Sequence, residues 1–205
     1  LFHPGDDWHY GFSTDALGHV IERVSGMPLD GFLRGRLFEP LGMADSHFDV
    51  PEDALHRFGT DHFVREDGTV IVRDEPRRDP EFIGVTFISG GGGLVMTVDN
   101  YMRFCLMMQS GGSFDGKRIL GRETVRLMTR NVLPAGMRAG GRGGFGLGFA
   151  LEADGSGVRL PPPGSYYWGG AAGTFFWIDP TEALIGIFMP QRIGTPELVR
   201  STLQI

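Results

Sequence analysis

Tyr10 is the residue near the start of the sequence that is best placed for chemistry. It follows the Pro4-Gly5 turn and precedes Ser13-Thr14-Asp15, three residue types that cap helices. An apolar helical period follows at Leu17, Val20, Ile21 and Val24. Gly26 and Pro28 then predict the end of that helix. A phenol on a turn before a helix can face a cleft, although this segment alone favours a structural role for Tyr10 as an aromatic anchor.

The sequence encodes no serine nucleophile of a familiar kind. The esterase pattern Gly-x-Ser-x-Gly is absent, because the segments at residues 11–15 and 111–115 both end in aspartate. A Ser-x-x-Lys pair is also absent, since the single lysine, Lys117, has Phe114 three positions before it. The glycine run Ser89–Leu94 lacks the Gly-Lys-Ser/Thr of a phosphate loop. We expect the backbone of this run to pass close to a pocket or to a packed helix.

Composition argues against several other classes of site. The six histidines show no metal-ligand spacing, and Cys105, the only cysteine, excludes an internal disulfide and a cysteine-based zinc site. The net charge of -6, without a basic stripe, argues against nucleic acid as the main partner. No apolar run is long enough to span a membrane. We therefore expect no metal and no cofactor, and a lone cysteine fits a reducing compartment such as the cytoplasm.

The regular elements predicted over the first 130 residues are mainly helices. Beyond the helix after Tyr10, they are expected from Pro28 to Pro40, from Thr97 to Gln109 and over Arg122–Thr129. Cys105 lies on the apolar face of the third helix, which predicts a core thiol. A tight turn is expected at 114–120. Residues 44–88 are expected to be mostly irregular, with a short strand at 69–72 and a solvated charged loop at 73–79. A loop of that length often forms the wall of a substrate pocket.

Strands dominate the remainder of the chain. Residues 145–151, 166–168, 173–179 and 183–189, with a turn at 179–182, predict an antiparallel meander of at least three strands. Residues 197–205 predict the start of a helix. Helices first and consecutive strands last predict an α+β fold, an antiparallel sheet flanked by helices. We interpret residues 1–205 as one domain portion, mainly helical over 1–130 and strand-rich over 131–205.

With these elements in place, a set of motifs resembles the serine β-lactamase-like hydrolases. The pattern Pro4-Gly5-x-x-Trp8-x-Tyr10-x-x-x-x-Asp15-x-x-Gly18-x-x-Ile21-Glu22-x-x-Ser25-Gly26 resembles the region around that family's catalytic tyrosine. The match continues in order through Phe38–Met43, Ser89–Leu94, Asp99–Phe104, Gly111-Gly112 and Trp168–Pro180. It covers nearly the whole chain and implies a β-lactamase/transpeptidase-like fold. The nearest branch looks like the family VIII carboxylesterases and the related acyltransferases that make statin-type esters.

The resemblance implies acyl transfer through a covalent serine ester. Tyr10 would act as the general base, and the backbone N–H of Ala171 would donate to the oxyanion. Gly169 and Gly170 would let a substrate lie along the strand edge without obstruction. Trp168 would form a wall of the pocket. A phenol loses its proton only at alkaline pH, so such a base needs adjacent positive charge, which the family supplies through the lysine of Ser-x-x-Lys.

This sequence departs from the family's pattern in three places. Phe12 stands where class C β-lactamases carry the asparagine of Tyr-x-Asn, and Trp168-Gly169-Gly170 replaces Lys-Thr-Gly. The lysine that would hold a β-lactam carboxylate is thus missing, and a neutral rim that includes Phe12 favours small uncharged esters. The Ser-x-x-Lys segment is missing too, and the sequence starts at Leu1 without a methionine. We therefore expect a fragment or processed chain with a companion N-terminal polypeptide that carries Ser-x-x-Lys.

Two alternatives to a carboxylesterase stay open. One is a β-lactamase, D-amino-acid peptidase or acyltransferase of the same fold, because hydrolysis and transfer differ only in what reaches the acyl-enzyme. The other is a non-catalytic relative that binds acyl groups or peptidoglycan after losing the nucleophile. The presence or absence of serine in the companion segment separates the enzymatic interpretations from the binding one.

Overall fold

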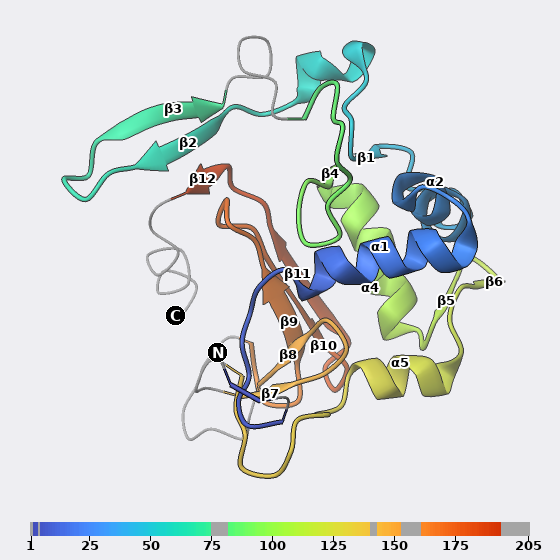
Figure 1. The fold of residues 1–205 in the computed structure, drawn as a ribbon. Coiled ribbons are helices and arrows are strands. Elements are labelled where there is room, and N and C mark those ends of the chain that lie inside the picture. The colour runs from blue at the N-terminus through green and yellow to red at the C-terminus, as the bar shows by residue number, and fades with distance from the viewer. Residues whose placement is uncertain (1, 4, 75–81, 140–142, 153–160, 194–205) are drawn as a thin grey trace.

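The computed structural model describes residues 2–3, 5–74, 82–139, 143–152 and 161–193. Its helices lie together beside a sheet, and a two-stranded hairpin projects from the body (Figure 1). The helix predicted at 197–205 lies outside the described residues.

The helices form where the apolar periods and breakers of the sequence predict them. Helix α4 (Val98–Gln109) is capped by Thr97, whose hydroxyl oxygen accepts the N–H of Asn100 at 3.3 Å. The segment predicted as a second helix is continuous but changes its winding, with a π-helical turn at Arg34–Phe38 between α2 and α3. The α-helices are α1 (Ser13–Ser25), α2 (Leu29–Leu33), α3 (Glu39–Leu41), α4 (Val98–Gln109) and α5 (Arg122–Met128).

The predicted meander is a five-stranded antiparallel sheet. Its order is β11-β10-β9-β8-β7, so each strand pairs with its neighbour in sequence. The predicted turn between the last two strands is held by Asp179, whose carboxylate accepts the N–H groups of Thr181 at 2.8 Å and Glu182 at 3.2 Å. The strands are β7 (Gly144–Phe145), β8 (Ala150–Leu151), β9 (Tyr166–Gly169), β10 (Phe175–Asp179) and β11 (Leu184–Phe188).

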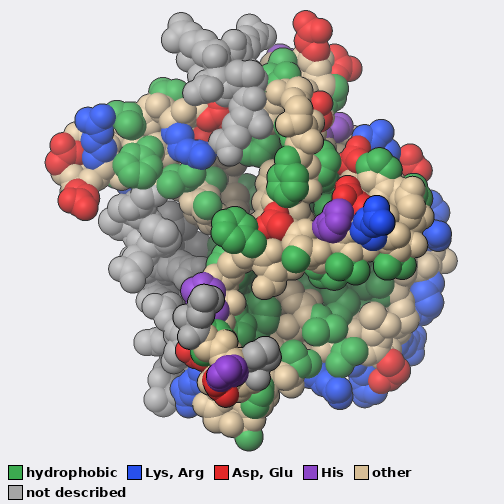
Figure 2. Space-filling view, in the orientation of Figure 1, with side chains coloured by type: hydrophobic (Ala, Val, Ile, Leu, Met, Phe, Trp, Pro, Cys, Tyr) green, Lys and Arg blue, Asp and Glu red, His purple; other side chains and the backbone are tan. Residues whose placement is uncertain are grey.

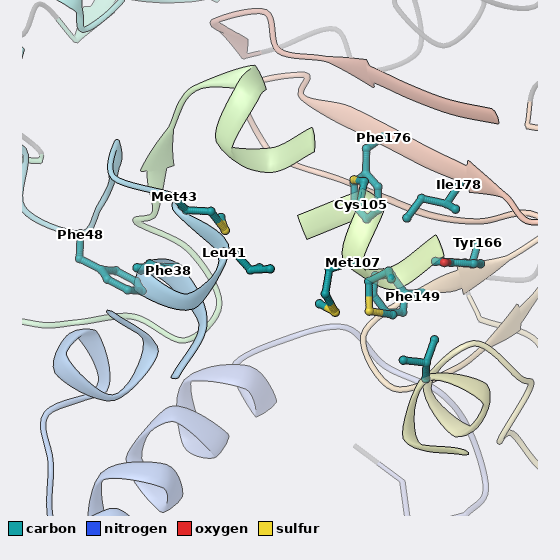
Figure 3. Packing of buried hydrophobic residues seen from close by; sticks show 12 residues of the cluster. Phe38, Leu41, Met43, Phe48, Cys105, Met107, Phe149, Tyr166, Phe176 and Ile178 are labelled. Carbon is teal, nitrogen blue, oxygen red and sulfur yellow. The ribbon is translucent and has the colours of Figure 1, made fainter. Parts of the chain in front are cut away.

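The core lies between α4 and one face of this sheet. Alternate residues of β10, Phe176 and Ile178, point toward α4, which contributes Cys105 and Met107 (Figure 3). Cys105 is completely buried, and burial raises the pKa of its thiol to about 12. The expectation that this cysteine is a core residue is confirmed.

The expectation that residues 44–88 are mostly irregular is wrong in part. The predicted strand at 69–72 is found as β3 (Val70–Asp74), and it pairs with an unpredicted strand, β2 (Asp61–Val64). Asp74 is buried within β3 rather than lying in a solvated loop; residues 75–79 of that loop lie outside the described part. The sequence did not predict this hairpin because its strands carry charged residues, among them the Asp61–Arg73 ion pair at 3.0 Å.

Five short strands and one 3-10 helix complete the described part of the fold. The turn predicted at 114–120 is confirmed as a hairpin of β5 (Ser113–Phe114) and β6 (Lys117–Arg118). The others are a 3-10 helix (Glu52–Arg57), β1 (Ser46–His47), β4 (Val95–Met96) and β12 (Arg192–Ile193). Strand β12 pairs in parallel with β2 and so joins the hairpin to the end of the main sheet. In the parts that the structure describes, no helix has both the length and the hydrophobicity to cross a membrane.

Candidate active site

Four aromatic rings bring the start of the sequence against the main sheet. The Tyr10 ring lies 5.4 Å from the Trp168 ring, centroid to centroid. Phe145 contacts Trp168 at 5.2 Å and Trp8 at 5.3 Å, and Trp8 stacks on Tyr10 at 6.4 Å. These rings come from the segment before α1 and from β7 and β9. Tilted and edge-on ring pairs at these distances are favourable beyond their buried area, so the cluster fixes the segment that carries Tyr10 against the sheet.

Tyr10 is accessible even though its ring is packed. The residue is 55% exposed, and no hydrogen bond to its hydroxyl is found within the described ranges. An open hollow of about 570 Å³ lies beside it, lined by Phe2 and residues 7–13, which include the exposed Phe12. A phenol hydroxyl in this position can therefore meet a group that comes from outside the described chain.

The turn that follows Trp168 leaves a backbone donor free. Gly170 donates its N–H to the Thr174 carbonyl at 2.8 Å, and Gly173 donates to the Gly170 carbonyl at 3.1 Å. The N–H of Ala171 donates to no group in the described segments. A Cβ at position 170 would lie 2.2 Å from Thr174 Oγ1, so any larger residue there would have to displace the Thr174 side chain. This steric reason for Gly170 adds to the one expected from the sequence.

A backbone hydrogen bond that the sequence does not reveal joins this turn to strand β12. Arg192 in β12 donates its backbone N–H to the Ala172 carbonyl at 3.0 Å. One residue earlier, the Gln191 carbonyl accepts the N–H of His62 in β2, also at 3.0 Å. The turn is therefore linked through β12 to the projecting hairpin. Nothing in the local pattern of residues 190–193 could have predicted these pairings.

The glycine run at 89–93 packs against the start of α1. Of the two roles expected for this run, packing against a helix is the one that the structure confirms. A Cβ at Gly90 would lie 2.2 Å from the Thr14 carbonyl oxygen, so only glycine permits the contact. Asp15 Oδ1 accepts the Ser89 hydroxyl at 2.5 Å and the Gly91 N–H at 3.2 Å. The Ser89 hydrogen bond, helped by backbone N–H groups, lowers the pKa of Asp15. These contacts fix the helix end that lies next to Tyr10.

The predicted site residues thus fall into two sets. Tyr10 and Trp168 are in contact, and Gly169, Gly170 and Ala171 continue directly from Trp168. Phe12 lies with Tyr10 in the lining of the hollow, and no ring contact joins it to Trp168. Their chemical roles stay predictions. Among the described residues, no group of three or more His, Cys, Asp or Glu side chains could hold a metal ion.

Comparison with known proteins gives one consistent match. The family model described as Beta-lactamase matches residues 1–204. Protein Rv1367c of Mycobacterium tuberculosis is 34% identical over 92% of this chain and 49% of its own length. Esterase EstB of Burkholderia gladioli is 28% identical over 87% of this chain and 48% of its own. The LovD6 mutant of simvastatin synthase from Aspergillus terreus superposes with a TM-score of 0.81 at 27% identity, over 98% of this chain and 53% of that one.

These matches agree both in the fold and in the share of each relative that is matched. The chain spans about half the length of the curated relatives that it matches. The arrangement of helices and antiparallel sheet is the β-lactamase/transpeptidase-like fold that the motifs predict.

Proposed function

The chain belongs to the beta-lactamase family of serine hydrolases, and we propose that it forms one part of a carboxylesterase that acts on small uncharged esters. The observation that carries the proposal is the contact between Tyr10 and Trp168, which joins the segment of the phenol to the strand that leads into the turn at Ala171. The N–H of Ala171 donates to no group among the described residues. A general base and an oxyanion donor are the two groups that acyl transfer needs around a nucleophile. The nucleophile would be the serine of a Ser-x-x-Lys segment outside the printed sequence.

The proposed reaction has two halves, each using the same groups. The serine oxygen attacks the ester carbonyl carbon while Tyr10 accepts the serine proton, and the N–H of Ala171 donates to the oxygen that becomes negative. The tetrahedral intermediate collapses when Tyr10 returns the proton to the leaving alcohol, giving an acyl-serine. Water then attacks the acyl-serine carbon while Tyr10 accepts a proton from the water, and Tyr10 returns that proton to the departing serine oxygen, so that the acid and the free serine are released.

The choice of an ester rests on what occupies the strand beside the turn. Trp168 stands at the position of the lysine in Lys-Thr-Gly and carries no charge, so a substrate carboxylate gains nothing from it. EstB, a matched relative, is an esterase. An acyltransferase is the second candidate, favoured by the match to simvastatin synthase, and it would need only an alcohol in place of water in the second half.

The proposal is tested on native material that contains this chain. Intact mass is measured before and after incubation with a fluorophosphonate, which labels activated serines. We expect a second polypeptide to gain one phosphonyl group while this chain stays unmodified. Hydrolysis of p-nitrophenyl butyrate, but not of the β-lactam nitrocefin, would support the esterase over the β-lactamase. Absence of labelling would overturn the proposal in favour of a binding relative, and labelling of this chain would contradict the absence of a nucleophile.

A further inference from the structure

The segment that carries Tyr10 depends on ring contacts for its position against the main sheet. Within the described ranges, no hydrogen bond joins residues 5–12 to a strand of that sheet. Two ring contacts make the connection. Tyr10 meets Trp168 of β9 at 5.4 Å, and two residues earlier Trp8 meets a ring of β7 at 5.3 Å. Figure 2 shows hydrophobic side chains beside this segment on the same face of the molecule.

Phe145 is the ring of β7 that makes the second contact. The four rings form a closed circuit, because Trp8 also stacks on Tyr10 and Phe145 also meets Trp168 edge-on at 5.2 Å. With the contact between Tyr10 and Trp168 alone, the segment could pivot about that pair of rings. The contact between Trp8 and Phe145 adds a second point of support. Two points of support fix the angle of the segment, and with it the direction of the phenol hydroxyl.

The backbone of Phe145 is fixed by the end of α5 and by the loop that follows. Its N–H donates to Asn131 Oδ1 at 3.1 Å, and its carbonyl accepts the Val132 N–H at 2.9 Å. The next residue, Gly146, packs so closely on α5 that a Cβ there would lie 2.0 Å from the Met128 carbonyl oxygen. The Phe145 ring is therefore a firm support for a segment that has no such backbone bonds to the sheet.

We propose that Phe145 is a positioning residue for Tyr10, an inference that rests on the proposed function. Phe145 acts through Trp8, and it holds the phenol where the serine proton is transferred. Proton transfer requires hydrogen-bond distance, and a displacement of about 1 Å can slow a reaction about 100-fold. The proposed wall of the pocket, Trp168, is held separately by the pairing of β9 with β10. Loss of the Phe145 ring should therefore lower kcat and leave KM nearly unchanged.

The competing interpretation is that Phe145 only stabilises the sheet. Phe149, at the start of β8, shows what that role looks like. It is buried, and its ring contacts Tyr166 at 5.3 Å and Phe176 at 6.1 Å within the core. Phe145 is only partly buried, and its ring contacts are with Trp8 and Trp168. The two phenylalanines thus provide a matched pair.

The test is the hydrolysis of p-nitrophenyl butyrate by the assembled protein. We expect Phe145→Leu to lower kcat at least about tenfold with KM changed less than about twofold. Phe145→Tyr keeps the ring and should restore the parental kcat. Phe149→Leu is the control, because it removes a core ring that touches neither Trp8 nor Tyr10. It should lower Tm more than Phe145→Leu does and leave kcat unchanged.

A double-mutant cycle tests whether Phe145 acts through Trp8. Trp8→Leu and Phe145→Leu break the same contact, so their effects on kcat should not add. We expect kcat of the double variant to lie within about twofold of that of Trp8→Leu.

Fluorine NMR reports the geometry without any need for activity. The assembled protein is labelled with 5-fluorotryptophan, and the Trp8 signal is identified by its absence from Trp8→Leu. We expect Phe145→Leu to shift and narrow this signal, because Trp8 loses its support and moves more freely. Phe149→Leu should leave the signal in place.

The outcomes separate this inference from the proposed function. If the parent hydrolyses no ester, the proposed function is contradicted, and an unmoved Trp8 signal in Phe145→Leu would overturn the positioning role as well. If the parent is active and Phe145→Leu keeps its kcat, the inference is wrong and the proposed function stands. Equal losses of kcat in Phe145→Leu and Phe149→Leu would point to general loosening of the sheet and overturn the inference. Additive losses in the double-mutant cycle would overturn the route through Trp8.

Discussion

The ring of Tyr10 provides its packing, whereas its hydroxyl provides its proposed chemistry. The ring holds the contact with Trp168, and the hydroxyl makes no hydrogen bond within the part of the chain that the structure covers. Tyr10→Phe removes the hydroxyl and keeps the ring, so we expect thermal stability to change little. Loss of a general base should lower kcat/KM for p-nitrophenyl butyrate about 100- to 10,000-fold in the assembled protein.

A matched control shows whether the hydroxyl itself matters. Tyr101→Phe removes a phenol hydroxyl from the core, where the ring packs on Phe176 at 4.9 Å, and should leave the rate unchanged. An unchanged rate in Tyr10→Phe would assign Tyr10 the anchoring role that its segment alone favours.

Asp15 links the start of α1 to the glycine run, and its charge should make that link sensitive to acid. The hydrogen bonds from Ser89 and Gly91 lower the pKa of Asp15 in the folded state. A group of this kind stabilises the fold fully above its unfolded pKa, and the contribution disappears as pH falls through the lower folded value. The Tm of Asp15→Asn should therefore lie below that of the parent at pH 7, and the difference should shrink as pH falls below about 4.

The outcome is taken from the pH dependence rather than from Tm at one pH. A difference in Tm that persists unchanged into acid would show that the lost contact is steric and that the carboxylate charge contributes nothing. Glu123→Gln is the control, because among the described residues Glu123 pairs with Arg126 alone, on exposed helix surface, and its loss should have little effect at either pH.

At the scale of elements, β12 connects the β2–β3 hairpin to the turn that contains Ala171. Arg192→Pro removes the one N–H that binds the Ala172 carbonyl, whereas Arg192→Ala removes the side chain and keeps that N–H. A displaced turn misplaces the proposed oxyanion donor, whose complete loss costs about 100- to 1000-fold. We expect Arg192→Pro to lower kcat about tenfold relative to Arg192→Ala with little change in KM. Equal kcat values for the two variants would show that the Arg192–Ala172 hydrogen bond does not position the N–H of Ala171.

The sequence and the structure agree best where a signal is local. Helix α1, the Asp179 turn and the core position of Cys105 follow from spacing and turn chemistry, and the structure confirms them. The contact between Tyr10 and Trp168 could be expected only from the order of motifs along the whole chain. Strand β2 was not predicted because Asp61 and His62 are not typical strand residues. The Arg192–Ala172 hydrogen bond was not predicted because it joins backbone groups and does not depend on the type of side chain.

At the scale of the whole molecule, the main sheet ends on a strand whose sequence is typical of an interior one. Strand β11 is apolar throughout, as strands buried on both sides usually are, and among the described strands it pairs only with β10. Leu184 and Phe188 at its two ends are exposed. An open apolar edge promotes association with other chains, and natural proteins cover or charge such edges. We therefore expect the companion polypeptide to protect β11 in the assembled protein.

Hydrogen exchange followed by mass spectrometry tests this expectation on peptides of the assembled protein and of the chain alone. The peptide 183–189 should exchange at least about tenfold more slowly in the assembled protein, because the outward N–H groups of β11 gain partners or lose solvent. The peptide 98–109 of α4, whose N–H groups are already bonded within the helix, is the internal control and should change little. If 183–189 exchanges equally fast in both samples, the companion does not reach this edge, and its contacts would have to be confined to the helical side of the molecule.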